Sequence, residues 1–418
     1  MPIPFRLLLA SFALLQHGFG SEDWPQFRGP RQDGISEAQG TPATWSETEH
    51  VKWKVAIPGE GWSSPIIGGN QQIWLTTALE GGRSLHAVCV DFASGKIVQD
   101  VEVFKNDNPP PKHDRNSYAS PTGIIDGGKV FVHFGAMGTA CIDARTGSVR
   151  WENRDLKVDH QNGPGGSLAQ FHDKLLIACD GMDAQYGVAL DKENGHVAWK
   201  TERSAIPILA KLPQDMRKAY GTPYVVNVNG QAQCVTTGSN RLYSYDPANG
   251  RELWYVDYPP GFSNVPTPVS DGKTLVTSTG FMKAQLWAIR LADAKGDATA
   301  SSVAWKQTAG APDQTSPIIV HDRVYMVSSG GILSCLDLAD GHVIWKERIG
   351  SDFAASPLLA GGNLYFFPTT GPCTVIKPGD TFQKIASNEL EAGCMASPAP
   401  VEKALIVRTK THLYRIEN

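Results

Sequence analysis

The sequence predicts an all-β protein, an eight-bladed β-propeller made of four-stranded antiparallel blades. Three observations predict this fold. A sequence motif recurs with fixed internal spacing, a small residue and a proline begin most of the repeat units, and the two ends of the propeller region supply complementary strands. The motif is clearest at 335–345, where an apolar strand ends at Asp337, a turn contains Gly341 and a second strand carries Trp345. Aspartate can accept N–H bonds within such a turn, and glycine can adopt a positive φ.

The motif recurs with glycine four residues after the aspartate and tryptophan four residues after the glycine. Its aspartates are Asp143, Asp191, Asp246 and Asp337, and its tryptophans are Trp151, Trp199, Trp254 and Trp345. Degenerate copies end at Gln99, where the docking residue is lost, at Trp305 after an inserted loop, and at Ile385. The repeat is about 47 residues long, which is typical of propeller blades. We expect the tryptophans to be apolar plugs between neighbouring blades.

A small residue followed by proline begins most of the units. These starts are Ser64-Pro65, Ser120-Pro121, Thr222-Pro223, Thr267-Pro268, Ser316-Pro317, Ser356-Pro357 and Ser397-Pro398, while the third unit begins near 165–167 without a proline. Four short strands follow each start, which is the composition of one propeller blade.

The two ends of the propeller region complement each other. Residues 413–417 match a third strand that no fourth strand follows, whereas residues 51–53 carry a motif tryptophan, Trp53, with no strands before it. We therefore expect the N-terminal strand to close the last blade, which removes an open edge. The predicted organisation is a signal peptide at 1–20, an extended arm at 21–49 pinned by Trp24 and Phe27, and a single propeller domain at 50–418.

The first twenty residues indicate export. Arg6 provides a positive charge, residues 7–15 form an apolar core, and residues 18–20 offer a small-residue cleavage site. The alternative is a membrane anchor, but the apolar run is too short to span a bilayer. A net charge of -4 gives no electrostatic reason to expect nucleic acid as a partner. We expect an exported monomer, periplasmic or extracellular, without a transmembrane span.

From residue 51 to the C-terminus, the motif resembles the Ala-x-Asp-x-x-Thr-Gly-x-x-x-Trp signature of the pyrroloquinoline-quinone-like (PQQ-like) eight-bladed propeller family. Residues 24–30, Trp-Pro-Gln-Phe-Arg-Gly-Pro, also resemble the opening of uncharacterised exported members. The resemblance implies the fold and little chemistry, because the same repeat serves quinone enzymes and an outer-membrane assembly scaffold.

The family's quinone enzymes clamp their cofactor between a tryptophan and a disulfide of adjacent cysteines, beside Ca²⁺ held by carboxylate and amide oxygens. This sequence has no two adjacent cysteines, and its docking tryptophans are accounted for by the repeat. We therefore expect no cofactor, with PQQ and calcium as the alternative. No cysteine or histidine spacing typical of a metal site occurs, so none is predicted.

Most of the seven cysteines occupy strand positions that favour a small buried side chain. Cys89, Cys141 and Cys335 stand two residues before a motif aspartate, and we expect them to be packed free thiols. Cys373 and Cys394 lie near strand starts beside loops, which leaves a disulfide between them open.

Connectivity places the loops between successive blades and the loops between second and third strands on one face of the propeller, opposite the Asp–Gly turns. The longest of these loops belong to consecutive blades and should converge around the axial funnel, a common location for binding sites. Their candidate ligand-binding residues are His113, Asn116, His160, Asp180, Asp183, Arg203, Tyr220 and Asn264. The alternative is that these charged groups simply pair with one another.

The sequence favours a secreted or periplasmic binding or scaffold module without catalysis, although it does not decide whether the chain is an enzyme. A small molecule, a glycan or a protein would bind at the funnel face. The alternatives are a PQQ-dependent oxidoreductase of the alcohol dehydrogenase type and a subunit of a cell-envelope assembly complex.

Overall fold

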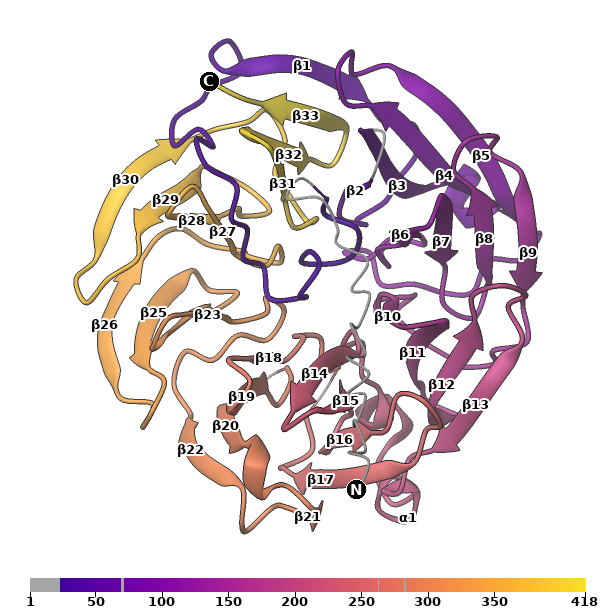
Figure 1. The fold of residues 1–418 in the computed structure, drawn as a ribbon, viewed down its shortest axis with the longest axis vertical. Helices are drawn as coiled ribbons and strands as arrows, with labels where there is room; N and C mark the ends of the chain where they lie inside the picture. The colour runs from indigo at the N-terminus through magenta and orange to yellow at the C-terminus, as the bar shows by residue number, and fades with distance from the viewer. Residues whose placement is uncertain (1–22, 69–70, 262, 282) are drawn as a thin grey trace, which may run out of the picture.

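A computed structural model describes residues 23–68, 71–261, 263–281 and 283–418. In these residues eight sheets surround a common axis as the blades of a propeller (Figure 1), so the predicted fold class is confirmed. The predicted signal peptide at 1–20 lies outside the described residues. Within the described part of the chain, no helix has the length and apolar character needed to cross a membrane.

Blades one to four follow one another along the chain, each with its first strand nearest the axis. Their strands are β2 (Ile66–Gly68), β3 (Gln72–Leu79), β4 (Ser84–Asp91) and β5 (Ile97–Lys105); β6 (Ile124–Asp126), β7 (Lys129–His133), β8 (Thr139–Asp143) and β9 (Val149–Asn153); β10 (Ala169–Phe171), β11 (Lys174–Asp180), β12 (Gln185–Asp191) and β13 (Val197–Glu202); and β14 (Tyr224–Val228), β15 (Gln231–Thr237), β16 (Arg241–Tyr245) and β17 (Glu252–Asp257).

Blades five to eight complete the ring. Their strands are β18 (Val269–Ser270), β19 (Thr274–Ser278), β20 (Leu286–Arg290) and β22 (Val303–Gln307); β23 (Ile318–Val320), β24 (Arg323–Val327), β25 (Ile332–Asp337) and β26 (Val343–Arg348); β27 (Leu358–Ala360), β28 (Asn363–Phe366), β29 (Cys373–Lys377) and β30 (Gln383–Asn388); and β31 (Ala399–Val401), β32 (Ala404–Arg408), β33 (His412–Ile416) and β1 (Val51–Ala56).

Short helices occur in the connections, at η1 (Glu80–Gly82), α1 (Ile206–Leu209), η2 (Gln214–Arg217) and η3 (Leu291–Asp293). The inserted loop of blade five also forms β21 (Gly296–Asp297), which pairs in parallel with β17 and adds a fifth strand to blade four.

The Asp–Gly turn and the motif tryptophan act together across blade boundaries. In blade three, Asp191 Oδ1 accepts the backbone N–H groups of Glu193 and Asn194, which fixes the turn. Gly195 has a φ of 73° and lies against the indole of Trp151 from blade two, where an added Cβ would come within 2.4 Å of the ring. Glycine is therefore required both for the backbone conformation and for the close approach.

Five motif tryptophans donate their indole N–H to a carbonyl in the turn of the next blade, over 2.8 to 3.0 Å. They are Trp53, Trp151, Trp199, Trp305 and Trp345, and they bond to Phe92, Lys192, Pro247, Leu338 and Gly379. Trp254 bonds instead to Gln233 Oε1 of its own blade, because blade five has η3 and the insertion in place of this turn.

The expectation that blade one has lost its docking contact at Gln99 is wrong. Gln99 Nε2 donates to the carbonyl of Ala144 over 2.8 Å, at the turn position that an indole N–H reaches elsewhere. An added Cβ on Gly147 would lie 2.7 Å from Gln99 Oε1. The amide therefore replaces the hydrogen bond of the indole but not its apolar area.

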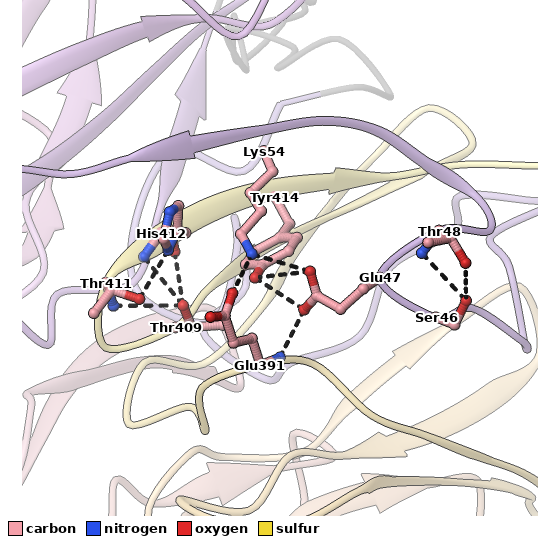
Figure 2. Close-up of polar contacts among 9 residues, drawn as sticks. All are labelled: Ser46, Glu47, Thr48, Lys54, Glu391, Thr409, Thr411, His412 and Tyr414. Atoms are coloured by element: carbon pink, nitrogen blue, oxygen red, sulfur yellow. Dashed lines mark hydrogen bonds and ion pairs between the residues drawn. The ribbon is translucent and has the colours of Figure 1, made fainter.

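The N-terminal strand closes the last blade, as predicted. Strand β1 pairs antiparallel with β33, with Trp53 opposite Arg415 and Lys54 opposite Tyr414. Figure 2 shows how polar contacts hold this pair to its surroundings. Lys54 Nζ lies 2.5 Å from Glu391 Oε2 and 3.0 Å from Glu47 Oε2, and the Tyr414 hydroxyl lies 3.1 Å from Glu47 Oε1.

The N-terminal arm runs across the middle of the ring (Figure 1). Trp24 exchanges two backbone hydrogen bonds with Ile67 of blade one. The side chain of Gln32 bonds to the Pro223 carbonyl of blade four, and Ser36 N donates to the Leu359 carbonyl of blade seven. The arm therefore contacts inner strands on opposite sides of the axis.

We expect removal of the arm and β1 to disrupt the propeller. A chain that begins at Gly61 leaves β33 as an unpaired edge and uncovers the axis, so it should aggregate or melt well below the parent chain. Size-exclusion chromatography with light scattering and a thermal melt measure both effects. The control begins at Asp23 and keeps the arm and the strand. A monomer that starts at Gly61 and melts with this control would contradict the closure.

The two docking residues should differ in their contribution to stability. Trp199→Ala removes apolar area and a hydrogen bond, and should lower the free energy of unfolding by about 3 kcal/mol. Gln99→Ala removes mainly the hydrogen bond, and should cost about 1 kcal/mol. Urea denaturation measures both, with the exposed Gln383→Ala as the control. Equal losses at Trp199 and Gln99, or no loss at Gln99, would reject this account of docking.

Candidate functional site

A ring of hydroxyl groups surrounds the axis where the blades begin. Two residues before each inner strand stands a serine or threonine, and all eight are buried; they are Ser64, Thr122, Ser167, Thr222, Thr267, Ser316, Ser356 and Ser397. The backbone N–H of each donates to the hydroxyl of the next blade's residue over 2.9 to 3.1 Å, except from Thr222 to Thr267. In blade two the ring residue is Thr122, two positions beyond the start at Ser120 that the sequence indicated.

Above this ring lies an axial funnel, a cavity of about 380 Å³ on the face that carries the loops between blades. All eight hydroxyl residues line it, and Phe27 of the arm contributes to its floor. Its walls include the side chains of Trp62, Tyr220, Asp313 and Gln314. The arm therefore contributes a side chain to the axial cavity.

Three predicted candidates, His113, Asn116 and Tyr220, line the funnel. Asn116 also organises the loops, because its Nδ2 donates to the carbonyls of Asn162 and Pro164. The Tyr220 hydroxyl donates to the His160 carbonyl over 2.5 Å, and burial raises the pKa of this phenol. The Asn116 amide N–H groups and the Tyr220 hydroxyl are therefore already used in hydrogen bonds to the protein.

Asp180 and Arg203 lie between blades three and four rather than in the funnel wall. Their side chains are 2% and 0% exposed and form two parallel hydrogen bonds, of 3.0 and 2.6 Å. Arg203 Nη1 also donates to Thr236 and Tyr245, and its guanidinium lies 4.6 Å from the centre of the Tyr243 ring. Burial raises the pKa of Asp180, and the Arg203 charge opposes this shift. The two charges neutralise each other, which matches the alternative in the sequence analysis that these charged groups pair with one another.

The other candidates also lie away from the funnel lining. Asp183 Oδ1 accepts the Asp159 backbone N–H over 2.7 Å and lies beside a separate cavity of about 370 Å³. His160 lines this second cavity, its ring nitrogens have no hydrogen-bond partner, and burial lowers its pKa to about 4. Asn264 is buried and bonds to the Ser278 carbonyl and the Tyr258 hydroxyl.

Several funnel residues were not among the predicted candidates, including Phe27, Trp62, Arg115, Asp313 and the hydroxyl ring. Arg115 forms an ion pair with Asp352, which joins the loop before blade two to the loop before blade seven. The recurring Ser/Thr start was the available sequence signal for the ring. Nothing in the sequence spacing relates Phe27 or Asp313 to the same cavity.

All seven cysteines are buried free thiols in this structure, and the disulfide left open between Cys373 and Cys394 stays a prediction. Both residues line the same small pocket, and burial raises the pKa of each thiol. Cys89, Cys141 and Cys335 are buried, as expected for packed thiols.

One group of potential metal ligands occurs in the described residues, at Asp337, Asp340 and His342 in the turn of blade six. Asp337 Oδ1 already accepts the Ala339 N–H, and Asp340 Oδ1 accepts the backbone N–H of His342 and lies 2.7 Å from its Nδ1. The prediction that the chain has no metal site stays a prediction.

The funnel lining does not fit the quinone clamp described above. Among the described lining residues there is one carboxylate, Asp313, and no cysteine. Trp62 stands in the wall, with its indole N–H bonded to the Arg115 carbonyl over 3.1 Å. The described lining thus lacks the sulfur layer of the clamp, while Asp313 is its single carboxylate beside the amides of Asn116, Asn162 and Gln314.

A model of the protein family described as "Outer membrane protein assembly factor BamB" matches residues 72–226 and 184–418. Tetrathionate hydrolase from Acidithiobacillus ferrooxidans is 27% identical over 157 residues. That match covers 36% of this chain and 29% of the hydrolase, so the likeness is confined to less than a third of that protein.

Solved propellers resemble the whole ring. BamB from Moraxella catarrhalis is 11% identical with a TM-score of 0.58, over 87% of this chain and 99% of that chain. A europium-containing methanol dehydrogenase is 12% identical with a TM-score of 0.68, over 93% and 89%. A quinohemoprotein alcohol dehydrogenase from Comamonas testosteroni is 11% identical with a TM-score of 0.68, over 94% and 80%. At these identities the likeness shows the fold alone.

The buried Asp180–Arg203 pair should be structural. Arg203→Ala leaves a buried carboxylate without its cation, and should lower the free energy of unfolding by about 3–5 kcal/mol. Asp183→Asn is the control, since it keeps an oxygen acceptor for Asp159 N and should change stability by less than about 0.5 kcal/mol. Thermal and urea denaturation decide. Unchanged or increased stability in Arg203→Ala would instead indicate a strained functional site.

Proposed function

The chain belongs to the PQQ-like propeller family described as outer membrane protein assembly factor BamB, and from this premise we propose that it is an exported, non-catalytic binding module. Its binding site is the axial funnel, which takes up a small ligand or the end of a larger one. The rigid ring of blades serves as the scaffold that holds the loops of this site.

The observation that carries the proposal is the composition of the funnel. Eight buried hydroxyls and several aromatic side chains, Phe27 of the arm among them, line a site of about 380 Å³, within the usual size range of ligand pockets. Acid–base or nucleophilic catalysis needs a base within hydrogen-bond reach of its partner. Among the described lining residues no histidine bonds to a hydroxyl, and His113 Nδ1 accepts the Arg115 backbone N–H. The carboxylate of Asp313 accepts a hydroxyl hydrogen bond only from Ser329, which does not line the funnel.

Two alternatives remain from other functional classes. The name of the matched family supports a subunit of an outer-membrane assembly complex, in which the propeller would bind protein partners. The fold shared with the alcohol and methanol dehydrogenases supports a quinone-dependent oxidoreductase. The funnel lining disfavours the oxidoreductase, for the reasons given above.

Calorimetry with ligands of three classes tests the proposal: maltose as a neutral sugar, alanylalanine as a peptide and citrate as a carboxylate. At least one should bind, and Gln314→Ala should weaken it by about tenfold or more. Gln314 lines the funnel and makes no side-chain hydrogen bond, whereas the exposed Gln383→Ala is the matched control. Failure of all three probes would reject the proposal, as would dye-linked alcohol oxidation after loading with PQQ and Ca²⁺.

A further inference from the structure

We propose that the ligand of the axial funnel is a neutral polyhydroxylated molecule, a sugar or a polyol, with one apolar face packed against Phe27. This inference rests on the proposed function and adds the chemical class of the ligand. Three features carry it: the unused donors of the hydroxyl ring, the aromatic side chains around them, and the sign of the charge in the wall.

The hydroxyl ring has hydrogen-bonding capacity that the protein does not use. Seven of its members accept a backbone N–H from the preceding blade, and Thr267 accepts none. None of the eight donates its own proton to another protein group among the described contacts. A hydroxyl has one donor and two acceptor sites, so each ring member keeps one donor and at least one acceptor site.

The positions of these hydroxyls make this unused capacity significant. Every member is at least nine-tenths buried and lines the cavity, where an unmet donor is destabilising unless water or a ligand oxygen accepts its hydrogen bond. A sugar hydroxyl both donates and accepts, as each ring hydroxyl does. A polyol is therefore the complement of a ring whose members all have this dual character.

Aromatic side chains supply the second feature. Phe27 stands at the floor within the hydroxyl ring, and Trp62 and Tyr220 stand in the wall. The C–H face of a sugar ring is apolar and packs well on flat aromatic surfaces, while its hydroxyls point outward around the rim. Ligand sites commonly combine mostly apolar lining with a few polar groups that set orientation.

The charges favour a neutral ligand over an anion. Asp313 Oδ2 accepts the Ser329 hydroxyl over 3.0 Å, but its Oδ1 is buried and has no partner. The guanidinium of Arg115 is paired with Asp352. An anion in the funnel would meet the Asp313 charge, and the only arginine or lysine among the described lining residues is the already paired Arg115, whereas a sugar hydroxyl can donate to Oδ1 in a charge-assisted hydrogen bond.

Glucose and glucuronate test the inference, because they share a ring and differ by one carboxylate. Calorimetry should show glucose or maltose binding to the full chain, and glucuronate binding about tenfold more weakly than glucose. Asp313→Asn should reduce this preference to about threefold or less. The matched control is Asp380→Asn, which should keep the preference. Asp380 is an exposed carboxylate of blade seven, paired with Arg323 of blade six.

The contribution of Phe27 to sugar binding is tested separately. Phe27→Ala should weaken sugar binding about tenfold, and Phe27→Tyr should retain it. Melting of both variants near the parent temperature shows that the arm is still in place, and Gln314→Ala provides a second funnel variant if Phe27→Ala does not fold.

The possible failures separate the two proposals. Binding of alanylalanine or citrate that depends on Gln314, without sugar binding, would overturn the ligand class and leave the binding function intact. If the variants of Asp313, Phe27 and Gln314 bind the sugar as the parent chain does, the sugar binds elsewhere and the inference is overturned. Failure of every probe would reject both the inference and the proposed function.

Discussion

The pairing of β1 with β33 is the contact on which the rest of the molecule depends. Each blade is stabilised by its neighbours, so a ring of eight blades has one more interface than an open row of the same blades. This last interface forms only because a strand from the beginning of the chain completes the blade at its end. The hydroxyl ring closes at the same place, where Ser397 N donates to Ser64 Oγ over 3.1 Å.

The N-terminal arm links the inner strands of several blades. A propeller of eight blades has an axial opening, and here residues of the arm bond to inner strands on several sides of it. Arg28 is 2% exposed, with Nη2 bonded to the carbonyls of Asp33 and Pro317. Burial lowers its pKa to about 10, so it still carries its charge at neutral pH. The two carbonyls offset part of the cost of burying this cation, whereas Nε and Nη1 are buried without a hydrogen-bond partner.

The comparison with quinone-dependent propellers separates fold from chemistry. The overall fold is shared with these propellers at about a tenth sequence identity. The rest of the lining is less constrained by the repeat: the ring hydroxyls also link neighbouring blades, but side chains such as Asp313 and Gln314 come from loops outside the docking motif. A shared propeller therefore carries little information about the ligand, and the side chains around the axis carry most of it.

The fold followed from the sequence because its determinants are local. An aspartate, a glycine and a tryptophan at fixed spacing define one turn and one contact with the next blade, and the incomplete units at 51–53 and 413–417 indicate the closure. The tertiary structure decided which polar residues meet. Connectivity placed Asp180, Arg203 and His113 in loops of one face, but only packing turned the first two into a buried pair and the third toward the funnel. Phe27, Asp313 and the eight hydroxyls share one cavity although they are distant in sequence, because ring closure and the path of the arm bring them to a common axis.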